Sequence, residues 1–210
     1  MDLGNPSASV LGGVSGAVLT VLAKTTLPLT GPTIASLSQT QVSRAGVNRV
    51  MGELVESGLV HAVQAGKAKL FSLNRDHVAA DAIEALASLK QILFQRIRDQ
   101  VATWNTSPIS VVLFGSTARG DASSNSDVDL LIVRSSRLDA NDLAWSADLA
   151  NLIRSIQAWS GNGCELLEYS QAELKKLAQS SDPLFESIRI DGMSLYGLSV
   201  ASLLGRSKPR

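Results

Sequence analysis

The chain has 210 residues, of which 45% are hydrophobic and 18% are charged, as is typical of one large or two small globular domains. Its 19 basic and 19 acidic residues cancel, so the overall charge neither requires nor excludes a polyanionic partner. The single cysteine, Cys164, excludes an intramolecular disulfide and a cysteine-rich metal site. Because Asp2 stands where a signal peptide is positive and no apolar run reaches about 20 residues, we expect a cytoplasmic protein without a membrane span.

Three short helices are predicted in the first part of the chain. The first covers residues 14–23, and the second begins near Thr30 or Gly31, either of which could cap it. The third opens at Ser43, carries apolar residues at helical spacing, and is expected to stop at Gly58. A β-hairpin should follow, because "LVHAVQAGKAKLFSLN" contains two β-prone runs around an Ala-Gly turn.

Three helices followed by a hairpin predict a winged helix-turn-helix domain at residues 1–77. The segment "SRAGVNRVMGELVESGLV" resembles the recognition helix of winged-helix regulators. The resemblance implies DNA contacts from this helix and from the hairpin, and a homodimer if the DNA site is a palindrome. The expected contact residues are Ser43, Arg44, Asn48, Arg49, Lys67 and Lys69. A winged helix that contacts only protein is the alternative, since residues 1–110 carry just 9 basic against 7 acidic side chains.

The longest periodic stretch is residues 78–104, whose apolar residues trace one stripe of an amphipathic helix. We expect this helix to link two modules over residues 78–107. The next segment, residues 108–198, alternates strand, glycine-rich turn, strand, helix, strand and two helices, which predicts a small α/β domain with a mixed sheet. Residues 199–210 are expected to form a basic tail, and the whole chain to be of the α+β class.

Two aspartates at alternate positions, Asp127 and Asp129 in "SDVDLLIV", are the strongest sign of chemistry. Residues two apart on a strand point to the same face, with Cα atoms about 6.5 Å apart. At an effective dielectric of about 20, two unit charges at that distance repel by about 2.5 kcal/mol. A proton or a divalent cation is needed to relieve this repulsion, and Mg²⁺ prefers such carboxylates together with phosphate oxygens and water.

A Gly-Ser turn at the end of the preceding apolar run supplies the other half of a site. Gly115 lets the backbone approach a ligand closely, and Ser116 adds a hydroxyl beside exposed N–H groups. Phosphates held by this turn and bridged by Mg²⁺ to the two aspartates would make a nucleoside triphosphate site. Gly-Ser and Asp-x-Asp are each common, but ten residues separate them here, and the combination is specific.

The motif "GSTARGDASSNSDVD" resembles the signature of the nucleotidyltransferase superfamily, and in particular its minimal nucleotidyltransferases. The resemblance covers residues 108–197. It implies that Gly115 and Ser116 hold the triphosphate of ATP or another nucleoside triphosphate, that Arg119 supports the phosphates, and that Asp127 and Asp129 bind Mg²⁺.

The superfamily also implies a third, catalytic and metal-binding carboxylate on a later strand. The segment "GNGCELLEYS" offers Glu165 or Glu168, of which Glu165 fits better because apolar residues flank it.

The function implied is transfer of a nucleotide to a hydroxyl, and minimal nucleotidyltransferases resemble antitoxins that adenylylate a cognate HEPN-type toxin. A DNA-binding module on the same chain would suit autoregulation or recruitment. Two alternatives remain open. One is a small-molecule acceptor such as an aminoglycoside, and the other is a transcription regulator whose nucleotidyltransferase domain only senses nucleotide.

Overall fold

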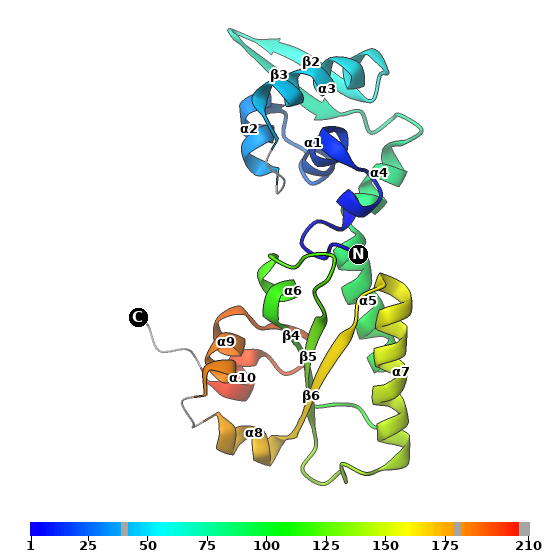
Figure 1. Ribbon diagram of the computed structural model, residues 1–210, viewed down its shortest axis with the longest axis vertical. Helices are drawn as coiled ribbons and strands as arrows, with labels where there is room; N and C mark the ends of the chain where they lie inside the picture. Colours follow the sequence, from blue (N-terminus) through cyan, green and yellow to red (C-terminus); the bar gives the residue numbers. More distant parts are fainter. Residues whose placement is uncertain (39–41, 179–181, 206–210) are drawn as a thin grey trace. The chain divides into compact units, whose positions relative to one another are not determined.

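The computed structural model describes residues 1–38, 42–178 and 182–205, which divide into two compact units (Figure 1). The N-terminal unit contains Asp2 and Gly4–Lys90. The C-terminal unit contains Gln91–Arg210 together with Met1 and Leu3, and Leu3 is fully buried in its core. Each unit is an assembly of helices on a small sheet, so the chain is of the α+β class, as predicted.

The N-terminal unit packs helices against a three-stranded antiparallel sheet of strand order β1-β3-β2 (Figure 1). Its elements are η1 (Pro6–Ser9), α1 (Gly13–Ala23), β1 (Leu29–Thr30), α2 (Gly31–Leu37), α3 (Arg44–Glu56), β2 (Val60–Ala65), β3 (Ala68–Leu73) and α4 (Ala80–Ala87). The three predicted helices and the hairpin are therefore all present, and β1 adds a short third strand to the sheet.

Side-chain caps explain where the helices of this unit begin. The Thr30 hydroxyl accepts a hydrogen bond from the Thr33 N–H at the start of α2, and the Ser43 hydroxyl accepts one from the Gly46 N–H at the start of α3. Beyond the last residue of α3, Gly58 adopts a positive φ of 75°, which ends the helix as expected. The apolar faces of α1, α2, α3 and the sheet form one core.

The prediction of a single helix over residues 78–104 is wrong, because the structure has two helices there. Helix α4 ends at Ala87 and α5 (Leu89–Ala102) follows after Ser88, whose N–H still bonds to carbonyls of the preceding turn. Leu93 and Ile97 of the predicted stripe pack in the core of the C-terminal unit, whereas Ile83 of α4, which lies outside that stripe, packs in the core of the N-terminal unit.

The C-terminal unit is built on a four-stranded sheet of order β6-β5-β4-β7. Strands β5 and β6 are parallel and the other pairs are antiparallel, which confirms the predicted mixed sheet. Its elements after α5 are β4 (Ser110–Phe114), α6 (Gly115–Arg119), β5 (Val128–Arg134), α7 (Leu143–Ser160), β6 (Cys164–Ser170), α8 (Gln171–Leu177), α9 (Pro183–Asp191), β7 (Met193–Gly197) and α10 (Val200–Leu204).

Two of these elements, β7 and α10, were not expected. Strand β7 pairs with β4 along the edge of the sheet. Helix α10 lies where a tail was predicted over residues 199–210, and Leu203 and Leu204 are buried in the core. The segment predicted to be a tail therefore begins with an ordered helix at residues 200–204, while its basic residues, at positions 206–210, lie outside the described part of the chain.

The two central strands of the C-terminal unit are buried on both faces. Leu130 and Ile132 of β5 contribute to the cluster formed with α5 and α7, whereas Leu131 and Val133 contribute to the cluster formed with α8, α9 and α10. Burial on both sides explains why this strand has a continuous apolar sequence rather than an alternating one. Strand β5 is thereby fixed by packing on its two faces as well as by its two neighbours.

Candidate active site

The pairing of β5 with its two neighbours places Asp129 between the other expected site residues. In the antiparallel β4–β5 pair, Asp129 lies opposite Phe114, the residue directly before Gly115. In the parallel β5–β6 pair, the partner of Asp129 is Glu165. Because paired residues of adjacent strands share a face of the sheet, Asp129 and Glu165 point the same way.

Gly115 begins α6 with a positive φ of 68° and lies directly against the Asp129 side chain. A Cβ atom at this position would lie only 2.0 Å from Asp129 Oδ2. Both the backbone conformation and this close approach therefore require glycine at the turn. The carboxylate and the Gly-Ser turn predicted to hold phosphates are thus immediate neighbours.

Asp127 lies in the loop just before β5, in contact with the loop before β6. A Cβ atom on Gly163 would lie 2.3 Å from Asp127 Oδ1, so this carboxylate also rests against a glycine. The Val128 N–H donates a hydrogen bond to the Gly163 carbonyl (2.9 Å), and the buried Thr117 hydroxyl of α6 donates one to the Asp127 carbonyl (3.3 Å). These bonds hold the backbone on both sides of the carboxylate.

Asn162 anchors the same loop, although nothing in its local sequence "GNGC" singles it out as a supporting residue. Its side-chain amide donates to the carbonyl oxygens of Ser126 (2.9 Å) and Ser124 (3.3 Å), and the residue is only 3% exposed. A buried amide that bonds two carbonyls of one loop restricts how far that loop can move. Asn162, Gly163 and Thr117 are therefore supporting residues of the site that sequence reasoning missed.

The carboxylates of the site lie close enough together to change the pKa values of neighbouring groups. Burial raises the pKa of Asp129 above its ordinary value, and the carboxylates of Glu165 and Asp127 raise it further, whereas the Arg119 guanidinium lowers it. Burial, with the same three carboxylates, raises the pKa of the Cys164 thiol to about 12. Cys164 is consequently a neutral thiol at physiological pH, in keeping with a packing role rather than a nucleophilic one.

The two glutamates of β6 have different surroundings. Glu168 accepts a hydrogen bond from Trp145 Nε1 (2.9 Å) and forms an ion pair with Arg134 Nε (2.8 Å). Glu165 is exposed and neighbours Asp129. Glu168 is therefore committed to structural contacts, and Glu165 is the glutamate that lies beside the aspartates.

Arg119 and Ser116 both lie on α6, which begins at Gly115. The Arg119 guanidinium pairs with Asp121 (3.2 Å) and, more loosely, with Asp191 at the end of α9 (3.9 Å). Asp191 opens the segment "DGMSLYG", which lies within the resemblance over residues 108–197, but it was not predicted to contact the site. Arg119 thus contributes positive charge close to a cluster of carboxylates.

The donor set fits a magnesium ion that also binds phosphate. Within residues 1–38, 42–178 and 182–205, no group of three or more His, Cys, Asp or Glu side chains is arranged to hold a metal ion. The expected three-carboxylate ligand set of Asp127, Asp129 and Glu165 is therefore not assembled by the protein alone. Asp127 and Asp129 are a pair of carboxylates of the kind that binds Mg²⁺ together with phosphate and water oxygens.

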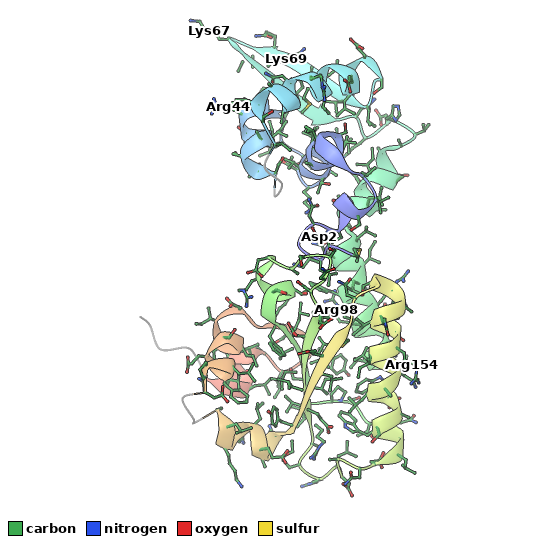
Figure 2. All side chains as sticks on the ribbon, in the orientation of Figure 1. Asp2, Arg44, Lys67, Lys69, Arg98 and Arg154 are labelled. Atoms are coloured by element: carbon green, nitrogen blue, oxygen red, sulfur yellow. The ribbon has the colours of Figure 1, made fainter. Side chains whose placement is uncertain are left out.

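The residues expected to contact DNA lie on α3, at its N-cap, and on the β2–β3 hairpin. Ser43 caps α3, and Arg44, Asn48 and Arg49 are exposed along its first two turns. Lys67 lies in the hairpin turn and Lys69 in β3, both exposed, and Figure 2 shows them with Arg44 projecting from this unit. None of the four cations forms an ion pair with a described residue.

Residues 94–178 match the protein family described as "Nucleotidyltransferase domain". The match covers less than half of the chain and includes every residue of the site described above except Asp191, so it identifies a nucleotidyltransferase domain within the C-terminal unit. No curated protein is similar enough to the chain to count as a relative. In the described ranges, no helix has the length and apolar character needed to cross a bilayer.

Three solved structures show limited similarity over 53% of this chain. They are a toxin–antitoxin with AMP-PNP (18% identity, TM-score 0.38, 80% of that chain), a doubly substituted toxin–antitoxin MntA-HpeT (16%, 0.37, 80%) and a singly substituted form of MntA-HpeT (18%, 0.36, 78%). Scores this low do not establish a shared overall structure.

Replacing Asp129 with Asn should stabilise the C-terminal unit at neutral pH, without Mg²⁺ or nucleotide, by about 1 kcal/mol after allowance for solvent screening. A carboxyl group whose pKa is raised by folding opposes folding when it is charged, and it ceases to do so once it is protonated. The gain should therefore be full above the raised pKa and disappear below the ordinary pKa of Asp. The measurement is urea unfolding followed by tryptophan fluorescence, since Trp104, Trp145 and Trp159 all lie in the C-terminal unit.

The matched control for this substitution is Asp139→Asn, which makes the same chemical change at an exposed residue of the same unit and should leave stability unchanged. A lower stability of Asp129→Asn at pH 7 would contradict the electrostatic account of the site.

Gly115→Ala should cost at least about 2 kcal/mol of unfolding free energy, because it adds a clash with Asp129 to the cost of a positive φ. Gly161→Ala measures the cost of the positive φ alone. Gly161 has a similar φ of 74°, and the nearest atom to its added Cβ lies 3.9 Å away. The loss at Gly161 should be about 1 kcal/mol. Equal losses in the two variants, measured by the same fluorescence assay, would mean that Asp129 does not rest on the turn.

Proposed function

We propose that the C-terminal unit is a Mg²⁺-dependent nucleotidyltransferase that transfers AMP from ATP to an acceptor hydroxyl. The observation that carries the proposal is the position of Asp129, which lies against the Gly115 turn and is paired with Glu165. This arrangement lies inside the segment that matches the nucleotidyltransferase domain family. Grouping three carboxylates is electrostatically unfavourable. The proposed function explains why they are grouped, since the cation bound with a triphosphate would neutralise their charge.

The turn between β4 and α6 is proposed to hold the triphosphate. Gly115, lacking a side chain, lets phosphate oxygens approach the backbone beside Asp129, and the Ser116 hydroxyl and the nearby N–H groups would donate to them. Arg119 would offset part of the phosphate charge, consistent with its effect on the pKa of Asp129.

Asp127 and Asp129 are the proposed ligands of Mg²⁺, with phosphate oxygens completing the ligand set. When bound, the ion would stabilise the negative charge that develops on the phosphate oxygens during transfer. Glu165 is proposed to orient the acceptor hydroxyl and to accept its proton as the hydroxyl attacks the α-phosphate and pyrophosphate leaves. Its exposure beside Asp129 suits a group that must meet an acceptor from solution.

The acceptor is proposed to be a hydroxyl on a partner protein, such as a cognate HEPN-type toxin. This part of the proposal rests on the resemblance of "GSTARGDASSNSDVD" to minimal nucleotidyltransferases.

The N-terminal unit is proposed to be a winged helix-turn-helix domain that binds DNA. Support comes from its order of elements, in which α2 and α3 are followed by the β2–β3 hairpin. Further support comes from the exposed cations Arg44 and Arg49 on α3 and Lys67 and Lys69 on the hairpin. Cations free of ion pairs are available to phosphates, whose contacts supply most of the affinity for DNA. A homodimer would read two half-sites of a palindrome.

The transfer reaction is tested with α-labelled ATP and Mg²⁺, in the presence and absence of the protein encoded by the neighbouring gene. Label should pass to that protein, and Asp127→Asn or Asp129→Asn should lower the rate at least about a hundredfold because each removes a proposed metal ligand. Asp139→Asn, which leaves the site intact, should retain the wild-type rate.

Transfer by Asp127→Asn/Asp129→Asn at the wild-type rate would show that the site is wrongly assigned. Nucleotide binding without transfer to any acceptor would instead favour a nucleotide-sensing regulator.

Binding to DNA is tested by fluorescence anisotropy over a series of salt concentrations, with a duplex from the region upstream of the gene. Lys67→Gln/Lys69→Gln should weaken binding and reduce the slope of log affinity against log salt by about 1 for each phosphate that is no longer neutralised. Lys24→Gln removes an exposed charge elsewhere in the same unit and should leave the slope unchanged. An unchanged slope in the double variant would argue against hairpin contacts with DNA.

A further inference from the structure

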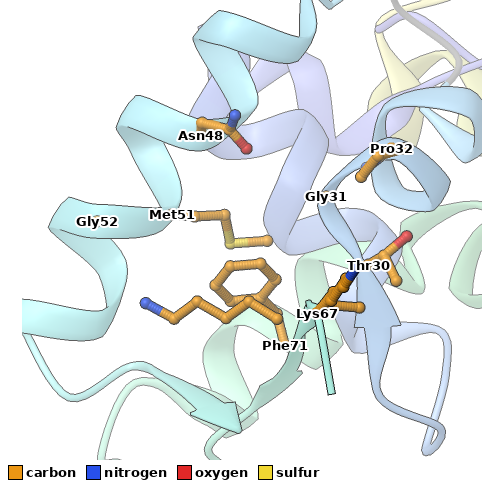
Figure 3. A pocket seen from close by; sticks show the side chains of 10 residues that line it. Thr30, Gly31, Pro32, Asn48, Met51, Gly52, Lys67 and Phe71 are labelled. Atoms are coloured by element: carbon orange, nitrogen blue, oxygen red, sulfur yellow. The ribbon is translucent and has the colours of Figure 1, made fainter. Parts of the chain in front are cut away.

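A pocket of about 520 Å³ lies in the N-terminal unit, between the start of α2, the middle of α3 and the β2–β3 hairpin (Figure 3). Its volume is within the range of small-molecule sites, which commonly have an apolar floor and a few polar groups. The floor is formed by Met51 and Phe71, which Figure 3 shows pointing toward one another. Both side chains belong to the core of the unit, so the floor is rigidly supported.

One wall of the pocket is open because Gly52 has no side chain. Gly52 lies in the middle of α3, where glycine is less favourable than every residue except proline. No described atom outside its own helical turn lies within 4 Å of a Cβ built there, whereas a Cβ on Gly46 would lie 3.1 Å from Ser43 Oγ. Packing thus explains a small residue at Gly46 but not at Gly52, where the missing side chain only widens the pocket.

The polar groups of the pocket favour an anion. Lys67 and Lys69 line it, no acidic residue does, and neither ammonium group forms an ion pair within the described residues. The Lys69 ammonium lies 5.7 Å from the centre of the Phe71 ring, so positive charge stands directly over the apolar floor. Asn48 adds an amide that can donate a hydrogen bond.

We propose that this pocket binds a small aromatic carboxylate. The ring of the ligand lies on Met51 and Phe71 beside Gly52, and its carboxylate is held by the two lysines. Binding itself does not depend on the proposed function of either unit. Because Asn48, Lys67 and Lys69 are also proposed DNA contacts, the bound ligand would compete with DNA, and this consequence rests on the proposed DNA-binding function.

The experiment uses the full chain, with 2-naphthoate as the probe and 2-naphthalenemethanol as its neutral counterpart. Backbone ¹H–¹⁵N spectra are recorded during each titration. Naphthoate should bind with a dissociation constant of about 1 mM or below and shift the amides of Gly31, Asn48, Gly52 and residues 67–71. The alcohol should bind at least about tenfold more weakly, since it lacks the charge that the lysines recognise.

Two variants separate the pocket from the rest of the surface. Gly52→Leu fills the open wall with a better helix former, so it should preserve the fold and weaken naphthoate binding at least about tenfold. Lys67→Gln/Lys69→Gln should bring the affinity for naphthoate down to that for the alcohol. Lys24→Gln is the matched control for charge and should bind naphthoate as the wild type does.

The proposal is wrong if naphthoate fails to bind at 10 mM, which is about tenfold above the expected dissociation constant. This holds even if added DNA shifts the amide signals of the same residues. It is also wrong if a folded Gly52→Leu protein binds naphthoate normally, if the alcohol binds as tightly, or if the shifts lie outside the pocket. Failure of nucleotide transfer or of DNA binding would leave these titrations unaffected, so the two kinds of failure are distinguishable.

Discussion

The register of β5 between β4 and β6 is the constraint on which the candidate active site depends. It places Asp129 beside the end of β4, where the chain turns at Gly115, and opposite Glu165 on β6. A shift of one residue would turn Asp129 to the other face and break this arrangement. The register is held by apolar packing on both faces of β5, so the hydrophobic core fixes the position of the charged groups.

Much of this arrangement could be predicted from sequence because its signals are local. The caps at Thr30 and Ser43 and the stop at Gly58 each depend on a few adjacent residues, and all three are present. Gly115 and Asp129 were recognised together because their spacing matches a known motif, and the structure shows that their atoms are neighbours. The hydrophobic run of β5 indicated a buried strand, although it carried no information about which strands lie beside it.

The features that were missed depend on contacts between distant parts of the chain. Strand β7 is a short edge strand defined by its pairing with β4, and α10 is held by burial of Leu203 and Leu204, so neither has a strong local pattern. Asn162 acts on a loop that precedes it by more than thirty residues. The break at Ser88 separates α4, whose Ile83 packs in one core, from α5, whose Leu93 and Ile97 pack in another, and helical periodicity does not reveal such a division.

The parallel β5–β6 pair has opposite electrostatic character at its two ends. At the end where Asp129 and Glu165 meet, like charges push the strands apart, whereas at the far end the ion pair between Arg134 and Glu168 draws them together. The hydrogen bonds between these strands should therefore open first at the end with Asp129 and Glu165 and last at the end with Arg134 and Glu168. A ligand that neutralises the carboxylates would remove this repulsion and stabilise the weaker end of the strand pair. Ligand binding would therefore make the sheet more rigid.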